Sequence, residues 1–230
     1  MAFTREQSRA IDAIAIQRYG FSGLVLMENA GRGVVDVLLA LDPTLGDKAA
    51  RSVTILCGKG NNAGDGFVIA RHLEIRGVTA RVILLSPADE LQGDALSNYE
   101  ILRHTGVEVV ELAGVNDLAG ALAAEAADAE WVLDAMLGTG ALGEPREPLA
   151  KAIRWMNSQT ARRLAVDVPS GLDCDTGEPA ALTVRADHTC TFVAAKQGYA
   201  KDSAREYLGE LHVVSIGLPP GLIRDVADRC

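Results

Sequence analysis

Residues 53–66 read VTILCGKGNNAGDG, and this stretch decides the fold. Its first six residues, 53–58, form a continuous apolar run that ends in glycine, which is typical of a strand buried on both faces of a parallel sheet. A helix is predicted from about Gly64 to Arg76. The glycines between strand and helix let the backbone approach a ligand, and the helix N terminus attracts an anion. The alternative is that Asn and Gly only shape a turn and Asp65 only caps the helix.

The same alternation of strand and helix extends outward from this stretch. Two helices are predicted before it, the first opened by Thr4 and closed by Gly20, the second opened by Ser22 and ended at Asp42. Strands that alternate with helices imply βαβ units and a parallel sheet, so we expect one doubly wound α/β domain over residues 1–230. Beyond the opening stretch, the predicted strands cover 80–86, 107–112, 131–136, 163–169, 188–194 and 211–217, and the predicted helices cover 89–105, 115–127 and 147–158.

The composition is that of an ordinary globular protein. Of 230 residues, 48% are hydrophobic and 23% are charged, which excludes a disordered or collagen-like chain. The net charge of −9 argues against nucleic acid as the main partner, because phosphate binding relies on clustered Lys and Arg. No apolar leader opens the sequence, and charges interrupt its most apolar helix, so neither a signal peptide nor a membrane span is expected.

The cysteines and histidines show no metal-binding pattern in the sequence. There is no CxxC pair and no Cys/His group at zinc spacing, so we expect reduced thiols and a cytoplasmic location. The histidines likewise form no evident metal or catalytic group. These residues are Cys57, Cys174, Cys190 and Cys230, and His72, His104, His188 and His212.

Carboxylates interrupt two of the apolar strands. Asp134 lies within the strand at 131–136, and Asp167 lies near the end of the strand at 163–169. A buried carboxylate is costly unless it is paired or binds a cation, and the alternative is that it braces a loop. Because the carboxyl ends of parallel strands meet along one edge of the sheet, we expect both aspartates to converge beside the glycine-rich loop.

Other motifs limit the classes of reaction and ligand that the sequence allows. The loop after residue 58 is neither a G-x-G-x-x-G fingerprint nor a P-loop. Ser170 lacks the G-x-S-x-G context of a serine hydrolase. Lys196, after the strand at 188–194, could bind phosphate or move a proton, whereas the bland alternative is a solvated surface charge.

Four longer motifs resemble those of the NAD(P)H-hydrate epimerase family, also called the YjeF N-terminal domain. They are GKGNNAGDG, VLDAMLGTGALGEPREP, AVDVPSGLDCDTG and ADHTCTFVAAKQGY, and the opening TREQSRAID and GLVLMENAGRGV match as well. The resemblance covers about residues 4–218. It implies a Rossmann-like three-layer α/β/α sandwich with a mostly parallel sheet and two N-terminal helices. It also implies an isomerase that interconverts the R and S forms of hydrated NADH and NADPH (NADHX and NADPHX), a repair reaction that serves a partner dehydratase.

The resemblance also implies particular site residues. The substrate would contact one segment after the first strand, a second wall around the phosphates, and Asp167 at the nicotinamide end. A potassium ion would be held by an amide oxygen, a carboxylate and a hydroxyl, the hard oxygen ligands that such a cation prefers. The first segment comprises Asn61, Asn62, Ala63, Gly64 and Asp65, the second wall Gly138, Thr139, Gly140, Ala141, Leu142, Gly143 and Glu144, and the potassium ligands Asn62, Asp134 and Ser170.

Epimerisation at the hydrated carbon requires a group that gives and takes a proton, whether the hydroxyl leaves or the ring opens. We expect Asp167 to fill that role, with Lys196 as its partner or as a clamp on the substrate. Local groups would hold the phosphates despite the acidic total: loop N–H groups, the helix N terminus, the potassium ion, Lys59 and Lys196.

Some expectations remain open at this stage. Ala63 stands where many family members have glycine, so its backbone must not need a positive φ. The dehydratase activity must come from another protein if the chain is complete. The family resemblance suggests a homodimer, in which the small residues Ala30, Gly31 and Gly33 would approach a neighbouring helix, or else they pack within their own chain. The alternatives to the epimerase are a non-catalytic binding or scaffold module and another nucleotide-handling enzyme on the same fold.

Overall fold

The opening apolar stretch forms a central strand, and the sheet extends from it in both directions. The computed structural model describes residues 2–45 and 52–227. Within these residues the large sheet has seven strands in the order β4-β3-β2-β5-β6-β7-β9, all neighbours being parallel. The strands are β2 (Ser52–Cys57), β3 (Thr79–Leu84), β4 (Glu108–Glu111), β5 (Ala129–Ala135), β6 (Arg162–Val166), β7 (His188–Phe192) and β9 (Glu210–Val214).

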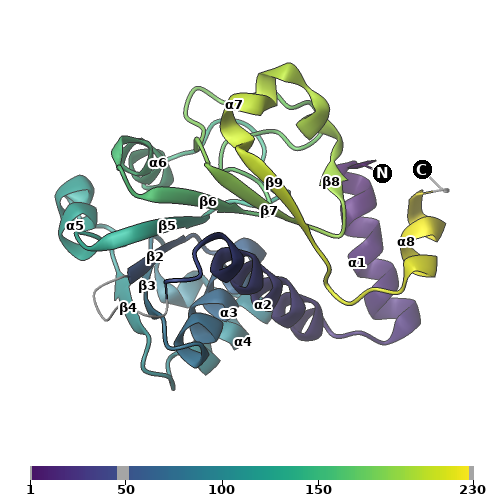
Figure 1. Ribbon diagram of the computed structural model, residues 1–230, viewed down its shortest axis with the longest axis horizontal. Coiled ribbons are helices and arrows are strands. Elements are labelled where there is room, and N and C mark those ends of the chain that lie inside the picture. Colours follow the sequence, from purple (N-terminus) through teal and green to yellow (C-terminus); the bar gives the residue numbers. More distant parts are fainter. Residues whose placement is uncertain (1, 46–51, 228–230) are drawn as a thin grey trace.

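Helices cover both faces of this sheet and make three layers (Figure 1). Successive strand residues alternate between the two faces: Ile55 packs in the core under α2, α3 and α4, whereas Leu56 packs in the core under α5 and α6. The three-layer α/β/α sandwich expected from the sequence is therefore confirmed. The helices are α2 (Gly23–Leu41), α3 (Asn61–Ile75), α4 (Gly93–Leu102), α5 (Leu118–Glu125) and α6 (Leu149–Ser158).

The first helix, α1 (Arg5–Tyr19), begins and ends as the sequence predicts. Its capping box is complete, since the Gln7 amide donates to Thr4 Oγ1 at 3.1 Å and the Thr4 amide donates to Gln7 Oε1 at 2.9 Å. It ends at Gly20, whose φ of 76° is in the left-handed region.

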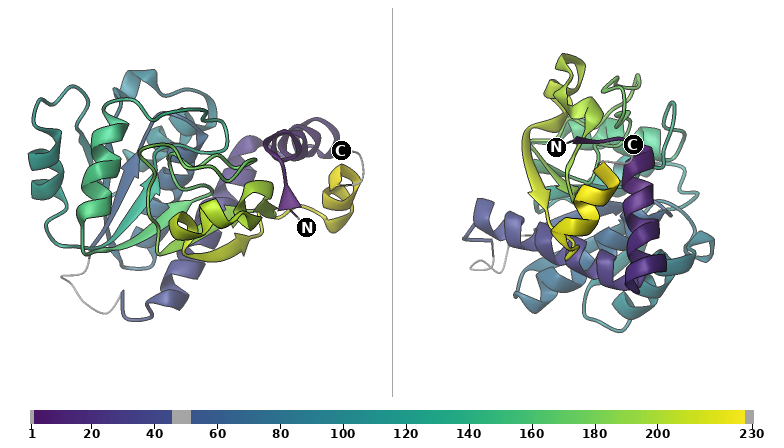
Figure 2. Two further views of the ribbon diagram at one scale, coloured as in Figure 1. Left: turned by 90° about the horizontal axis from the view of Figure 1, so that it is seen from above. Right: turned by 90° about the vertical axis from the view of Figure 1, so that its right-hand side faces the viewer.

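This helix is attached to the other end of the chain. The two-residue strand β1 (Ala2–Phe3) pairs in parallel with β8 (Ala195–Lys196), and α1 lies beside α8 (Pro220–Ala227) at one end of the molecule (Figure 2). The sequence reasoning missed this second, two-stranded sheet. It also missed α8 and the short elements that precede it: η2 (Gln197–Ala200), η3 (Asp202–Ala204) and α7 (Arg205–Leu208).

Three predicted boundaries need correction. Helix α3 begins at Asn61, three residues earlier than expected, so the asparagine pair lies in its first turn and not in a loop. The helix expected at 89–105 is split into a short turn, η1 (Ala88–Glu90), and α4. Strand β6 ends at Val166 because Asp167 takes a left-handed backbone conformation, with a φ of 65°.

The small residues of α2 pack within their own chain. A Cβ on Gly31 would lie 2.5 Å from Val68 Cγ1, and one on Gly33 would lie 2.3 Å from Val214 Cγ1. Ala30 is buried in the core beside α1. Of the two roles considered for these residues, packing inside the chain is the one confirmed.

The structure bears on two further expectations, that the cysteines are reduced and that no helix spans a membrane. Cys57, Cys174 and Cys190 are free and buried, and Cys230 lies outside the described residues. Among the described helices, none has the length and apolar character needed to cross a membrane.

Gly66→Ala is expected to destabilise the fold, because α3 meets the sheet closely at this position. An added Cβ would lie 2.8 Å from Cys57 Sγ and 2.9 Å from Ala135 Cβ. Overpacking of this kind costs roughly 1–3 kcal/mol, which denaturant unfolding would measure. Gly221→Ala in α8 is the matched control, since its Cβ would meet nothing within 4 Å. Equal stability of the two variants would contradict this packing argument.

Candidate active site

A cleft of about 1470 Å³ opens at the carboxyl ends of β2 and β5. These two strands are neighbours in the sheet, yet the chain runs from β2 outward through β3 and β4 before it returns to β5. Ligands of parallel α/β proteins bind at such a switch point. The start of α3 and the loop after β5 form two walls, and the ends of β6 and β7 with α1 complete the cleft.

Most residues predicted to contact the substrate line this cleft. Two do not: Ala63 is fully buried in the core between α3 and the sheet, and Gly64 packs against Met27 behind the wall. Ala63 has no positive φ, as the sequence required. The predicted residues that line the cleft are Asn61, Asn62, Asp65, Gly138, Thr139, Gly140, Ala141, Leu142, Gly143, Glu144, Asp167 and Lys196.

Asp134 is fully buried at the end of β5 and tied to the loop after β6. Its carboxylate accepts hydrogen bonds from Ser170 Oγ at 2.7 Å, from the Ser170 amide at 2.7 Å and from the Met136 amide at 3.1 Å. Burial nevertheless raises the pKa of Asp134 to about 6, and these three donors oppose that rise.

The backbone of one residue, Leu137, links this network to Asn62. The Leu137 amide donates to Ser170 Oγ at 3.0 Å, and the Leu137 carbonyl accepts from Asn62 Nδ2 at 2.9 Å. Asn62 Oδ1 is buried and has no hydrogen-bond partner among the described residues. The three residues predicted as potassium ligands therefore belong to one connected network, which holds one unpaired amide oxygen.

Asp167 stands at the end of β6 in a strained conformation. A φ of 65° is uncommon for a residue other than glycine and costs roughly 1–3 kcal/mol. Its backbone is held on both sides, because its amide donates to Cys190 O at 2.7 Å and its carbonyl accepts from Tyr199 Oη at 2.6 Å. Strain that the surroundings enforce is a mark of functional positions.

Lys196 is the partner of Asp167. Its side chain is 3% exposed, and Nζ lies 2.9 Å from Asp167 Oδ1 and 3.1 Å from Phe192 O. The same Oδ1 accepts from Thr191 Oγ1 at 3.2 Å. The alternative of a solvated surface lysine is therefore wrong.

Two further carboxylates face the same end of the cleft. Burial raises the pKa of Asp65 well above its usual range, and the charges of Asp167 and Asp12 raise it further. The pKa of Asp12, on α1, rises to about 6, because burial and the charge of Asp167 outweigh the opposing charge of Lys196. Sequence reasoning missed Asp12, since nothing local shows that α1 docks over this site.

Cationic side chains lie at other parts of the cleft wall. Lys59, expected to bind phosphate, lines the cleft and pairs with the exposed Glu90 at 2.6 Å. Arg9 and Arg146 also line it. The cleft thus has acidic and basic regions, although the chain as a whole carries a net charge of −9.

The family comparison agrees with this geometry. The model of the family described as YjeF-related protein N-terminus matches residues 23–198. The chain belongs to this family. The matched region contains each predicted site residue from Asn61 to Lys196, whereas Asp12 precedes it.

Several relatives are similar over nearly the whole of this chain. A Pirellula staleyi protein named NAD(P)H-hydrate epimerase is 46% identical over 97% of this chain and 96% of its own. A Rhodopirellula baltica protein of the same name is 41% identical over 96% and 86%. A bifunctional NAD(P)H-hydrate repair enzyme of Salinibacter ruber is 38% identical, but the match spans only 41% of it.

A solved structure supports the fold. The crystal structure of the yeast protein ynu0 superposes with a TM-score of 0.83 over 98% of this chain and 93% of its own, at 22% sequence identity. The yeast protein and the chain described here therefore share the same arrangement of layers.

Asp65→Asn is expected to stabilise the fold increasingly as pH rises. Because the folded-state pKa of Asp65 is raised, the folded protein keeps a proton that the unfolded chain releases above about pH 4. Wild-type stability therefore falls above that pH, by up to ~1.4 kcal/mol per unit until Asp65 ionises, and the variant escapes this loss.

Denaturant unfolding measures the effect, with a gain of ~1 kcal/mol or more expected at neutral pH and little gain near pH 4. The exposed Asp89 gives the control, and Asp89→Asn should show no such pH-dependent gain. If the gain in stability of Asp65→Asn were independent of pH, the pKa of Asp65 would not be raised in the folded protein.

Proposed function

We propose that this chain is an epimerase that interconverts the R and S forms of hydrated NADH and NADPH. Relatives that share 46% and 41% of its residues over nearly the whole chain bear the name NAD(P)H-hydrate epimerase. The observation that carries the proposal is the buried Asp167–Lys196 pair, 2.9 Å apart, in a cleft that also holds Asp65.

The cleft suits a dinucleotide that carries phosphates. Helix α3 begins at Asn61 without a side-chain cap, so its N terminus offers N–H groups to an anion. The wall formed by residues 138–144 faces it across the cleft, with Lys59 and Arg146 nearby. We place the phosphates here and the hydrated ring at the acidic end, beside Asp167.

The acidic end can move protons in both directions. Asp65, whose pKa burial raises, is the carboxyl group better suited to hold a proton and to donate it to the departing oxygen or ring nitrogen. Asp167, fixed by Lys196 and Thr191, offers a carboxylate oxygen that accepts a proton from the water that adds back, or from the hydroxyl group as the ring opens. When the hydroxyl or ring returns on the opposite face, the same two groups exchange roles.

The network around Asp134 fits a potassium ion. Asn62 Oδ1 is buried without a hydrogen-bond partner among the described residues, and the buried carboxylate of Asp134 accepts hydrogen bonds from neutral donors of Met136 and Ser170. With Ser170 Oγ, these oxygens are the hard ligands that such a cation prefers. Potassium would supply positive charge to this network and brace the loops that follow β2, β5 and β6.

The non-catalytic alternative is disfavoured by the same residues. A scaffold module has no need of a strained Asp167, a buried lysine beside it, or a carboxylate with a raised pKa in an open cleft. Each of these features costs stability, and such costs persist where activity depends on them.

We also propose a homodimer in the cytoplasm that acts beside a separate dehydratase. Ile16, Tyr19, Leu24 and Val25, around the turn between α1 and α2, are 37–47% exposed although apolar. A second copy of this chain would cover them. Relatives that carry both repair activities in one chain support a functional link to dehydration.

Asp167→Asn is expected to lower epimerase kcat by about 10²–10⁴-fold, because the variant cannot accept a proton. Binding of the hydrated cofactor should change only a few-fold. The measurement is the rate of R-to-S conversion of hydrated NADPH, followed by chromatographic separation of the epimers, with binding followed separately. Asp202→Asn, on the exposed surface, is the control. Near-normal turnover of Asp167→Asn would exclude the proposed role.

Potassium is expected to raise both turnover and the midpoint of thermal unfolding of the wild-type protein, relative to a buffer with choline in its place. Asn62→Ala removes the unpaired oxygen while leaving Asp134 and Ser170 bonded to each other, so both responses should be lost or strongly weakened. If the variant retains the wild-type rise in unfolding temperature, the ion is not bound at Asn62.

A further inference from the structure

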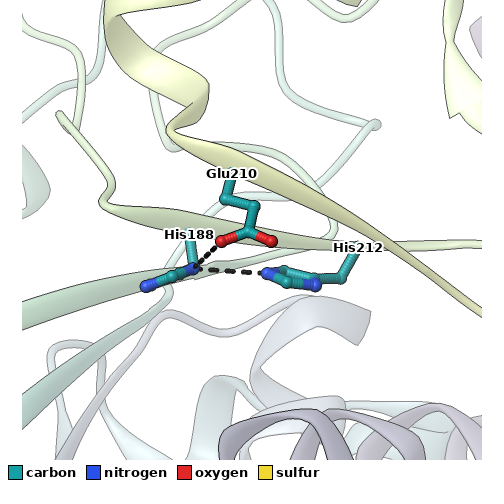
Figure 3. Close-up of side chains that lie close together, drawn as sticks. All are labelled: His188, Glu210 and His212. Carbon is teal, nitrogen blue, oxygen red and sulfur yellow. Dashed lines mark hydrogen bonds and ion pairs between the residues drawn. The ribbon is translucent and has the colours of Figure 1, made fainter. Parts of the chain in front are cut away.

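Two of the four histidines meet at the end of the sheet opposite the cleft. His188 begins β7, Glu210 begins β9, and His212 follows two residues later (Figure 3). In the parallel register, His188 lies directly opposite Glu210. His188 Nδ1 is 3.2 Å from His212 Nε2 and 3.6 Å from Glu210 Oε2, and the three ligand atoms all lie within 4.8 Å of one another.

We propose that His188, Glu210 and His212 form a binding site for a divalent transition metal of the zinc type. Imidazole nitrogen and carboxylate oxygen are common zinc ligands, at about 2.0–2.2 Å from the metal. Tetrahedral geometry at that bond length places neighbouring ligand atoms roughly 3.3–3.5 Å apart. The separations of His188 Nδ1 from His212 Nε2 and from Glu210 Oε2, 3.2 and 3.6 Å, bracket this spacing.

This group could not be recognised in the sequence because its members lie far apart along the chain. His188 and His212 belong to different strands, and only the pairing of β7 with β9 brings them together. No metal-binding group was evident among the histidines in the sequence because this proximity appears only in the folded chain. Glu210 is exposed, so the fourth coordination position faces solvent, where water can fill it.

Arg162 controls which nitrogen of His188 carries the proton. Its guanidinium, stacked on the Trp131 ring with Cζ 4.0 Å from the ring centroid, lies 3.1 Å from His188 Nε2. Because a guanidinium only donates, Nε2 accepts, and the proton of the neutral ring sits on Nδ1, toward His212. A metal at Nδ1 needs that proton on Nε2, so Arg162 opposes metal binding and must give up this hydrogen bond.

The experiment is a zinc titration of the untagged, metal-stripped chain in competition with a chromophoric chelator. We expect the wild-type protein to take one equivalent of zinc from the chelator, and His212→Ala to bind zinc at least tenfold more weakly. His104→Ala, an exposed histidine of the same chain, should bind as the wild type does. Equal affinities of the wild type and His212→Ala would overturn the site, because zinc would then be held elsewhere, for example by thiols.

Arg162→Gln is the sharper test. A glutamine carbonyl can accept from His188 Nε2–H, as groups behind metal-binding histidines usually do, so zinc should bind about tenfold more tightly. If zinc bound these histidines only because they happen to lie close together, Arg162→Gln would not be expected to tighten zinc binding. Weaker or unchanged binding in Arg162→Gln would refute the role of Arg162. As an independent readout, zinc should raise the thermal unfolding midpoint of the wild type and not that of His212→Ala, because the ion joins β9 to β7.

Discussion

The buried carboxylate of Asp134 determines how the segments that form the cleft are arranged. A buried charge without donors would cost several kcal/mol, so Met136 and Ser170 must stand where their groups reach it. Leu137, between them in this network, is then fixed at both its amide and its carbonyl, and its carbonyl holds Asn62. Through this one side chain the ends of β5 and β6 and the first turn of α3 acquire a common geometry.

The acidic end of the cleft is unfavourable for the fold. The charges of Asp167 and Asp12 raise the pKa of Asp65, and the charge of Asp167 also raises that of Asp12. Both Asp167 and Val193 have positive φ values, of 65° and 67°. A Val in this region is a genuine outlier. The parallel sheet, with a packed core on each face, supplies the stability that tolerates this concentration of strain and like charge.

Much of the fold follows from local sequence patterns. The apolar runs locate the seven strands of the large sheet, and Thr4, Gly20 and Ser22 mark helix ends through capping chemistry that depends only on near neighbours. The carboxylates that interrupt β5 and β6 are visible because a charge in an apolar run is anomalous wherever it occurs. Their convergence then follows from the parallel sheet alone.

The features that escaped prediction depend on distant parts of the chain. Asp12 looks like any polar residue of a helix, and it reaches the cleft only because Phe3 pairs with Lys196. The histidine pair requires the register of β7 against β9. The early start of α3 was missed for a different reason: Asn and Gly favour turns, and here packing of Ala63 in the core overrides that preference.

The pairing of β1 with β8 also has a consequence for synthesis on the ribosome. Phe3 emerges long before its partner Lys196, with a delay between them of about 10–40 s at common rates of translation. Until then α1 lacks the strand and the helix α8 that cover Ile11 and Ala15. The first strands of the sheet can pair on the nascent chain before then, whereas the acidic end of the cleft is completed only after Lys196 has emerged, because Lys196 pairs with Asp167 there.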